Sequence, residues 1–495
     1  MIFKIYINPM KNMDALFNAE SVAIFGASGE EGKIGKNIMN NLRASDYTGK
    51  VYPINPSSKY ENKKILGYEV YKSLNDVNSG DEIDLGVIAL PSHYVKNAIL
   101  ECVDHGLKSA IIITAGFGEM GKEGKLLEGE IMEIAEKGNL KLVGPNTMGI
   151  WSEEKSLNIN ITFLTPTPGE IAFISQSGSS SIAVTTILQS MGVGLRYLVS
   201  TGNEASLTFE DYLEFFIQDN GVKEIIGILE GLRKPKKFLS ICKKNAGKKP
   251  IILLKVGTTK VGTKAASSHT GSITGSTDIY NSLFKQAGII SANSIEQLVD
   301  LTRAFYYYGD ILPKNNNVGI IMGGGGMGIL MADLAFQAGL NVADLSEDSI
   351  NKINEILPSY WNKMNPVDTV GIQDLSAYTQ VEKILLESKN FDAVIMNVLE
   401  IKSILEQSDP KHEEGKENKK MMLGIMNSME KSLARQQINA MKNSNKPVIF
   451  ISHLYPFAKL FRIFEKKRTL IVRRPDDAAF ILKNLYDYYN FKNKK

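Results

Sequence analysis

Residues 21–28 read Ser-Val-Ala-Ile-Phe-Gly-Ala-Ser, and residues 29–36 continue with Gly-Glu-Glu-Gly-Lys-Ile-Gly-Lys. The apolar run has the length of one buried strand, and the polar stretch that follows is typical of a helix. Glycines recur every third residue at the junction, at Gly26, Gly29, Gly32 and Gly35. Glycine permits a positive φ and lets a phosphate approach the N–H groups of a helix N-terminus. The stretch therefore predicts a ligand-binding turn, with a tight turn that binds nothing as the alternative.

The same alternation continues along the chain. Val- and Ile-rich runs recur, separated by segments with helical spacing, at 51–56, 85–91, 109–116, 140–146, 169–178, 194–202, 223–231, 249–257, 318–322, 392–401 and 446–452. Buried strands that alternate with helices indicate parallel sheets covered on both faces. We predict an α/β protein with a Rossmann-like domain and two further parallel-sheet domains, at 14–148, 149–310 and 311–495. A polar stretch near 402–446 has no strand pattern and reads as helical or partly disordered.

Composition excludes several classes of protein. The 495 residues are 43% hydrophobic and 22% charged, which is too apolar for wholesale disorder. A net charge of +3 is too small for a dedicated nucleic-acid binder. Two cysteines, Cys102 and Cys242, cannot build a disulfide framework or a zinc site. No apolar run is long enough to span a membrane and no signal peptide is visible, so we expect a cytoplasmic protein that binds neither nucleic acid nor membrane.

The ligand of the first glycine turn is not predicted to be NAD. A dinucleotide site needs an acidic residue about 20 residues later, at the end of the second strand, to bind the ribose hydroxyls. That strand ends in Tyr-Pro-Ile-Asn-Pro at 52–56, without a carboxylate, and the glycine spacing is not Gly-x-Gly-x-x-Gly. Both departures favour another molecule that carries a nucleotide.

One of the five histidines stands in an unusual context. His269 lies in a polar segment, Ala-Ala-Ser-Ser-His-Thr-Gly-Ser at 265–272. A neutral imidazole is a good nucleophile near pH 7, although an isolated histidine is more often structural or solvated. No Ser/His/Asp or Cys/His pattern accompanies it, so hydrolase chemistry has no support.

Two more turns of small residues join a strand to a helix. Their members are Ser177, Gly178 and Ser179 in the first turn, and Gly324, Gly325 and Gly326 in the second. Neither turn is a P-loop, and each could be an ordinary tight turn; as a helix start, each is also suited to an anion. Two such turns and an isolated histidine suggest that a phosphoryl group is bound at the turns and transferred by the histidine.

The chain resembles the α subunit of the NDP-forming acyl-CoA synthetases, in particular acetate–CoA ligase (ADP-forming), in the succinyl-CoA synthetase superfamily. The motifs that carry the resemblance run in family order from about residue 15 to 371: SVAIFGAS, VYPINP, IITAGFGE, LVGPNTMGI, ISQSGSSS, YLVSTGNEA, ILEG, ASSHTGSITGS, FKQAGII, GGGGMGILMADLAFQAGL and NPVDTVG. The resemblance implies a CoA-binding domain, then two flavodoxin-like, succinyl-CoA-synthetase-like domains. It implies the interconversion of acyl-CoA, ADP and phosphate with acid, ATP and CoA, through an acyl phosphate and a phosphohistidine.

The resemblance also implies roles for individual residues. His269 matches the phosphorylated histidine, and Glu230 matches the carboxylate that orients and stabilises it. The glycine turns at 177–179 and 324–326 match the helix N-termini that hold the phosphohistidine, one for each of its two sites. CoA contacts carry over to Gly26, Ala27, Ser28, Gly29, Lys33, Asn55, Pro91 and Thr114. The resemblance implies no metal site in this chain.

No ATP-grasp segment is recognisable in the chain. We therefore expect a separate ATP-grasp β subunit, which binds ADP or ATP with Mg²⁺, in an α2β2 heterotetramer. Two departures from the family are the Gly-Gly-Gly-Gly turn at 323–326, where a mixture such as Asn-Ala-Gly-Gly is usual, and the long polar stretch after Ile401. The main alternative is a CoA-binding regulatory protein without turnover. A Rossmann oxidoreductase is opposed by the missing ribose-binding acid.

Overall fold

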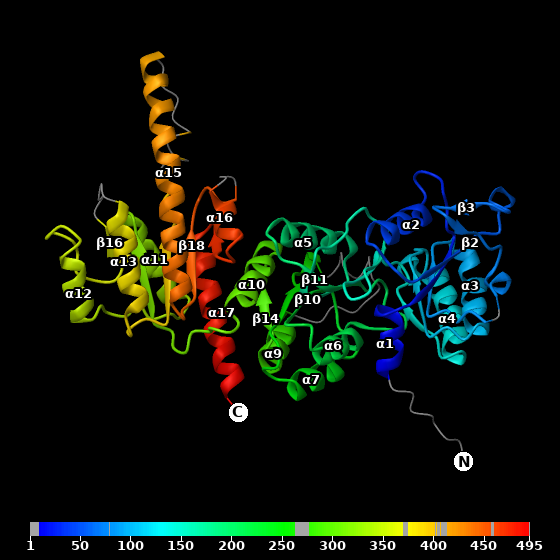
Figure 1. Cartoon of the computed structure of the whole chain (residues 1–495). Helices are drawn as coiled ribbons and strands as arrows, with labels where there is room; N and C mark the ends of the chain where they lie inside the picture. The colour runs from blue at the N-terminus through cyan, green and yellow to red at the C-terminus, as the bar shows by residue number, and fades with distance from the viewer. Residues whose placement is uncertain are drawn as a thin grey trace. The chain divides into compact units, whose positions relative to one another are not determined.

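The computed structural model describes residues 9–78, 80–262, 277–369, 375–400, 402, 406, 413–456 and 460–494. The chain divides into two compact units, Met1–Leu298 and Val299–Lys495. The first unit contains two of the three main sheets and the second unit contains the third (Figure 1). Each main sheet lies within one of the three predicted ranges, whereas the boundaries of those ranges stay predictions.

The first sheet is wholly parallel, as the Val- and Ile-rich runs predict. Its strand order is β2-β1-β5-β6-β7, with bounds Lys50–Ile54, Ser21–Phe25, Leu85–Ile88, Ser109–Ile112 and Lys141–Val143. Helix α2 (Ile34–Ala44) follows β1, α3 (Ser92–Asp104) follows β5 and α4 (Lys122–Lys137) follows β6. A two-stranded ribbon is formed by β3 and β4, at Lys64–Ile65 and Tyr68–Glu69. Short 3-10 turns lie at Ser58–Tyr60, Leu74–Asp76 and Gly118–Met120.

The second sheet has seven strands in the order β14-β13-β12-β10-β11-β8-β9. Five are parallel to one another: β10 (Pro168–Ser175), β11 (Leu195–Ser200), β12 (Glu224–Leu229), β13 (Ile251–Lys255) and β14 (Ile290–Ala292). Helix α5 (Gly178–Ser190) covers one face and α6 (Phe209–Gln218) with α7 (Pro235–Lys244) covers the other (Figure 1). Helices α9 (Thr277–Ala287) and α10 (Ile295–Tyr308) come next along the chain.

An antiparallel edge completes the second sheet. Strand β8 (Gly149–Ser152) pairs antiparallel with both β11 and β9 (Leu157–Asn160). Helix α2 of the first sheet packs on β9, where the side-chain nitrogen of Asn41 donates to the carbonyl of Asn160 at 2.6 Å. The hairpin is thus the seam between the two sheets of this unit. It departs from the wholly parallel sheet that the sequence suggested.

Helix α1 (Pro9–Phe17) also joins the two sheets. Phe17 is fully buried and stacks on Phe215 of α6, with ring centroids 5.6 Å apart. It also makes an edge contact with Tyr197 of β11, at 5.0 Å. Residues that precede the first strand therefore belong to the core of this unit.

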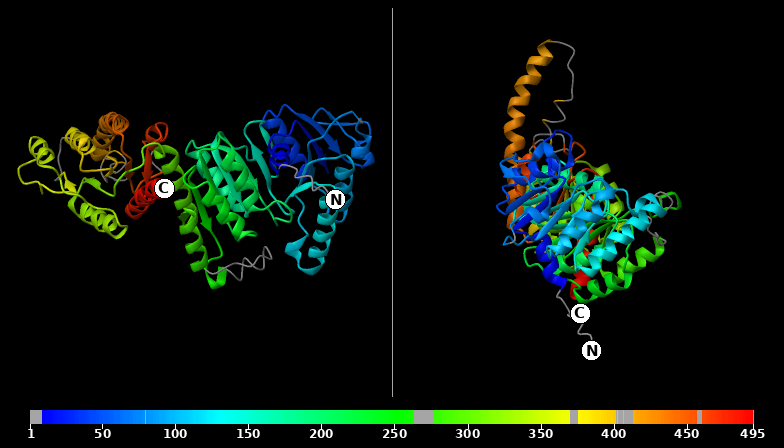
Figure 2. Two further views of the ribbon diagram at one scale, coloured as in Figure 1. Left: turned by 90° about the horizontal axis from the view of Figure 1, so that it is seen from below. Right: turned by 90° about the vertical axis from the view of Figure 1, so that its right-hand side faces the viewer.

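The third sheet is parallel and lies in the second unit. Its order is β16-β15-β17-β18-β19, with bounds Val367–Asp368, Val318–Met322, Ala393–Asn397, Val448–Ile451 and Leu470–Val472. Its helices are α11 (Gly325–Gln337), α12 (Glu347–Asn354), α13 (Leu375–Glu387), α15 (Glu413–Asn443), α16 (Phe461–Glu465) and α17 (Pro475–Asn493). Most of the polar stretch forms the 31-residue α15, whose first half extends away from this sheet (Figures 1 and 2).

Candidate active site

The first glycine turn has the geometry that the sequence predicts. Strand β1 ends at Phe25, Gly26 follows with φ of +85°, and α2 begins at Ile34. A Cβ on Gly26 would lie 2.4 Å from the carbonyl oxygen of Ala89, and one on Gly35 would lie 2.0 Å from that of Gly26. These two glycines are required because the backbones of the turn, the helix and the end of β5 lie against one another.

The first and second glycine turns open into one pocket of about 910 Å³. Seven predicted contact residues from the two turns and the strand ends line it: Gly26, Ser28, Lys33, Asn55, Pro91, Thr114 and Ser177. Gly178 and Ser179, at the start of α5, line it as well. The pocket therefore lies at the carboxyl ends of strands in two neighbouring parallel sheets, where α/β proteins generally bind ligands.

Several predicted contacts shape the walls of this pocket through hydrogen bonds within the protein. The side-chain nitrogen of Asn55 donates to the carbonyl of Ala27 at 2.7 Å, and the hydroxyl of Thr114 donates to the carbonyl of Leu90 at 2.6 Å. Ala27 is fully buried. The N–H of Gly29 donates to the hydroxyl of Tyr60 at 3.1 Å. Tyr60 also lines the pocket, although it was not among the predicted contact residues.

The second turn leads from β10 into the N-terminus of α5. The first turn of a helix has N–H groups without an intrahelical acceptor, which favours an anion there. Ser175 stabilises the turn, since its hydroxyl donates to the carbonyl of Ser177 at 2.7 Å. A Cβ on Gly178 would lie 2.2 Å from Cγ of Met148, so the helix start is closely packed.

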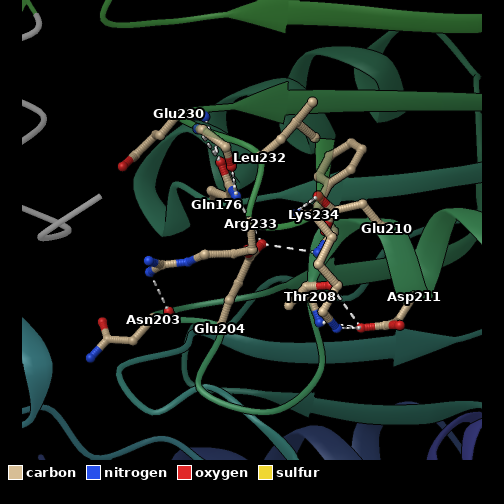
Figure 3. Close-up of polar contacts among 12 residues, drawn as sticks. Gln176, Asn203, Glu204, Thr208, Glu210, Asp211, Glu230, Leu232, Arg233 and Lys234 are labelled. Atoms are coloured by element: carbon tan, nitrogen blue, oxygen red, sulfur yellow. Dashed lines mark hydrogen bonds and ion pairs between the residues drawn. The ribbon is translucent and has the colours of Figure 1, made fainter. Parts of the chain in front are cut away.

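Glu230 lies directly after β12, beside this second turn, and is 8% exposed. Hydrogen bonds to side chains hold the backbone of residues 230–234. The N–H groups of Glu230 and Gly231 donate to Oε1 of Gln176, at 2.5 and 3.0 Å, and Leu232 N–H donates to the hydroxyl of Tyr280 at 3.0 Å (Figure 3). Lys234 N–H donates to Oε1 of Glu210 at 2.7 Å. Glu230 is therefore presented from a rigid platform.

A lysine approaches the same segment from the neighbouring strand. The ammonium of Lys255, at the end of β13, donates to the carbonyl of Glu230 at 2.8 Å. It also lies 4.6 Å from the ring centroid of Tyr280. Burial lowers the pKa of Lys255, and the charge of Glu230 opposes that shift.

Asn203 links this platform to the first sheet. Its side-chain nitrogen donates to Oε2 of Glu119 at 2.5 Å, in the 3-10 turn after β6, and to Oε2 of Glu128 at 3.0 Å, in α4. Its carbonyl accepts from the guanidinium of Arg233 at 2.8 Å (Figure 3). Asn203 and Glu204 belong to the motif YLVSTGNEA, in which no role was predicted for either residue.

Glu204 is a buried carboxyl next to Asn203, with a positive φ of 57°. Its Oε1 accepts from the side-chain nitrogen of Gln176 at 2.8 Å and from Phe209 N–H at 3.2 Å. Burial raises the pKa of Glu204 to about 7, because the loss of hydration outweighs the hydrogen bond from Gln176.

Glu204→Gln is expected to change how stability depends on pH. The unfolded chain releases this proton near the ordinary pKa of 4.5 and the folded chain near 7, so the folded state binds more protons between these values. The contribution of Glu204 to the free energy of unfolding therefore falls as the pH rises from 4.5 to 7. The full shift corresponds to at most about 3 kcal/mol. The thermal midpoints of wild type and variant are measured at pH 5 and pH 8. The midpoint of the variant relative to that of wild type should be higher at pH 8 than at pH 5. An equal difference at both pH values would contradict the expectation.

The remaining predicted residues lie elsewhere. Gly324, Gly325 and Gly326 lie in the second unit, where α11 begins at Gly325 directly after the turn that follows β15. The N–H of Gly323 donates to the side-chain oxygen of Asn397 at 2.9 Å, which fixes the start of this turn. His269 lies outside the described residues.

Within the described ranges, no group of three or more His, Cys, Asp or Glu side chains is placed to hold a metal ion. No helix in the same ranges is both long enough and apolar enough to cross a membrane.

Three family sequence models match successive parts of the chain. A CoA binding domain matches residues 20–153, a succinyl-CoA ligase like flavodoxin domain matches 168–305, and a ligase-CoA domain matches 318–404. The pocket residues of β1, β2, β5 and β6 fall in the first match, and the second turn with Glu230 falls in the second.

Individual proteins are similar over most of the chain. Acetate–CoA ligase [ADP-forming] II subunit alpha of Pyrococcus furiosus is 34% identical over 472 residues, which cover 94% of this chain and 96% of that one. Acetate–CoA ligase [ADP-forming] I of Archaeoglobus fulgidus is 38% identical over 383 residues, covering 77% of this chain. The match takes in only 54% of the Archaeoglobus protein, so this chain spans about half the length of that relative.

A solved structure has the same fold over nearly the whole chain. It is that of Ca. Korarchaeum cryptofilum dinucleotide forming Acetyl-coenzyme A synthetase 1 in complex with phosphate and ADP. The TM-score is 0.82 at 29% identity, with 97% of each chain covered.

Proposed function

The chain belongs to the ADP-forming acetate–CoA ligase family, in which it corresponds to the α subunit of the two-subunit members, and from this membership we propose that it carries out the acyl-CoA half of the ligase reaction. Phosphate attacks the thioester carbonyl, so that the C–S bond breaks, CoA leaves as its thiol and an acyl phosphate forms. His269 then takes the phosphoryl group, and the carboxylate is released. Transfer of this group to ADP regenerates the histidine and yields ATP.

The pocket shared by the first two glycine turns carries this proposal. One turn lies at the N-terminus of α2 and the other at the N-terminus of α5, and both line the same 910 Å³ space. A helix N-terminus attracts phosphate through its N–H groups and its positive dipole end. One phosphate-binding end suits the diphosphate of CoA, and the other suits the phosphate that attacks the thioester. The arrangement would therefore let both substrates of the first step bind side by side.

We assign the predicted residues to this scheme as follows. Lys33 lines the pocket at the start of α2, where its charge would neutralise CoA phosphates. The backbone at Ser177, Gly178 and Ser179 would hold the transferred phosphate, and the turn at 324–326 would hold the phosphohistidine at its second site. Glu230 would accept a hydrogen bond from one ring nitrogen of His269, which leaves the other nitrogen as the nucleophile.

Phosphorylation of ADP is assigned to a separate ATP-grasp β subunit. This chain covers about half of the Archaeoglobus ligase, and its Pyrococcus relative is named as a subunit alpha. A nucleotide cleft with Mg²⁺ is needed to neutralise the transferring phosphoryl group. The β subunit would supply both, in an α2β2 assembly.

The acyl-CoA half-reaction can be tested on the isolated chain. The protein is incubated with acetyl-CoA and ³²P-phosphate, and both protein-bound label and released CoA thiol are measured. We expect an acid-labile, base-stable label of up to one phosphate per chain and an equivalent amount of thiol. Binding of acetyl-CoA without label or thiol release would instead show a CoA-binding protein that has lost turnover.

A further inference from the structure

Gln176 is a pocket residue to which neither the sequence nor the proposed scheme gives a role. It follows β10 and immediately precedes the second glycine turn. Its side chain makes four hydrogen bonds to segments far away in the sequence (Figure 3). Its Oε1 accepts from the N–H groups of Glu230 and Gly231, at 2.5 and 3.0 Å. Its Nε2 donates to Oε1 of Glu204 at 2.8 Å and to the carbonyl of Gly231 at 2.7 Å.

These four partners determine which way the amide points. A glutamine amide has one oxygen with two lone pairs and one nitrogen with two hydrogens, so its full bonding capacity is used here. In the flipped orientation, the NH2 group would face the two N–H donors of Glu230 and Gly231. The amide oxygen would then face the Glu204 carboxylate and the Gly231 carbonyl. Glu204 and the Gly231 carbonyl therefore hold the amide in the orientation that binds Glu230.

The burial of Glu204 explains why a glutamine is suited to this position. Glu204 is 5% exposed, and Nε of the Arg233 guanidinium lies 3.9 Å from its Oε2. Other ionisable groups near this carboxyl are Glu210 and Tyr212 of α6. A second acidic residue at position 176 would add negative charge to a buried site that already disfavours it. A neutral side chain with a donor and an acceptor is therefore required.

We infer that Gln176 is a positioning residue of phosphoryl transfer, which sets the backbone of Glu230 relative to the phosphate-binding turn at 177–179. The inference rests on the proposed function. Because Gln176 is adjacent to that turn in the chain and its side chain is hydrogen-bonded to the N–H of Glu230, it connects the two directly. Loss of the amide would let the Glu230 carboxylate shift relative to the bound phosphate. Displacements of about 1 Å can cost a reaction about 10²-fold in rate.

Gln176→Met tests the inference, since methionine keeps the length of the side chain and removes all four hydrogen bonds. We expect the single-turnover rate of phosphohistidine formation from acetyl-CoA and phosphate to fall about 10²-fold. Glu230→Gln provides the scale for loss of the carboxylate itself. Gln218→Met, the same substitution at an exposed residue at the end of α6, is the matched control and should keep the wild-type rate.

Gln176→Glu separates positioning from simple destabilisation. While it is protonated, a glutamic acid at 176 can still accept from Glu230 N–H and donate one hydrogen bond to Glu204 or Gly231. Once ionised, it repels Glu204 and loses that donor. We therefore expect the rate deficit of Gln176→Glu to grow at least tenfold between pH 6 and pH 9, while that of Gln176→Met stays constant.

The outcomes distinguish this inference from the proposed function. If wild type forms no phosphohistidine, the proposed function fails and the inference fails with it. If wild type forms it and Gln176→Met retains the wild-type rate, only the inference is overturned. Slower variants whose rates follow the folded fraction, measured by circular dichroism at each pH, would likewise show that Gln176 is only structural.

Discussion

His269→Asn is expected to abolish the interconversion of acyl-CoA and ATP while CoA binding persists. Asparagine retains a polar side chain but cannot form a stable phosphoramidate, so the covalent intermediate is lost. The loss should far exceed the roughly 10²–10⁴-fold cost of removing a general acid–base group. CoA binding should continue because the residues assigned to CoA contacts lie at the turns and strand ends of the first sheet, whereas His269 is assigned to the phosphoryl group. Steady-state turnover with a competent β subunit and calorimetric titration of CoA measure the two properties.

His105→Asn serves as the control for this substitution. His105 is an exposed residue at the C-terminal end of α3, where Nε2 lies 3.0 Å from the side-chain oxygen of Asn75. It should leave both turnover and CoA affinity near their wild-type values. Turnover of His269→Asn above one hundredth of wild type would remove His269 from the mechanism.

The purified chain alone should form the phosphohistidine but fail to pass the phosphoryl group to ADP, so it should produce no ATP. It contributes the pocket and the phosphate-binding helix ends that the first half-reaction needs, whereas ADP and Mg²⁺ need carboxylates in a nucleotide cleft. ATP is followed by luciferase with acetyl-CoA, phosphate, ADP and Mg²⁺. We expect no sustained ATP production by the chain alone. Addition of an ATP-grasp subunit from a two-subunit relative should give sustained turnover.

Omission of acetyl-CoA is the control for this experiment, since without it neither phosphohistidine nor ATP should form. Sustained multiple turnover by the chain alone would show that it contains a nucleotide site of its own. It would also remove the need for a β subunit.

The parts of the fold that local sequence patterns determine were predicted well. The run at 22–25 is a fully buried central strand, β1, because a parallel strand covered on both faces must be apolar at every position. The turn before α5 was predicted for a similar reason, since small residues between a strand and a helix are a local signal. The β8–β9 hairpin was not predicted. Its sequence, Gly-Ile-Trp-Ser and then Leu-Asn-Ile-Asn, is short and partly polar. Asn158 and Asn160 are buried where β9 packs on α2 and where both side chains make hydrogen bonds with residues 162–165.

The site shows the same division between local and distant information. Glycine positions such as Gly26 could be recognised because the turn itself requires them. Gln176 and Glu204 could not be assigned roles, because their partners lie 28 to 55 residues away in the chain. An amide and a buried acid have no local pattern that reveals a shared hydrogen bond. The predicted roles of His269 and Glu230 came from the family resemblance and stay predictions.

The β8–β9 hairpin limits where this chain can be recombined with another. Because β9 receives α2 through Asn41 and Asn160, and α1 places Phe17 beside Tyr197, the first sheet carries surfaces shaped to fit the second. A recombination breakpoint near residue 148 would separate these matched surfaces and leave buried amides and aromatic rings facing an unrelated neighbour. The heritable unit of exchange is therefore the pair of sheets. A chimaera of this chain is therefore expected to fold only if both sheets come from the same parent.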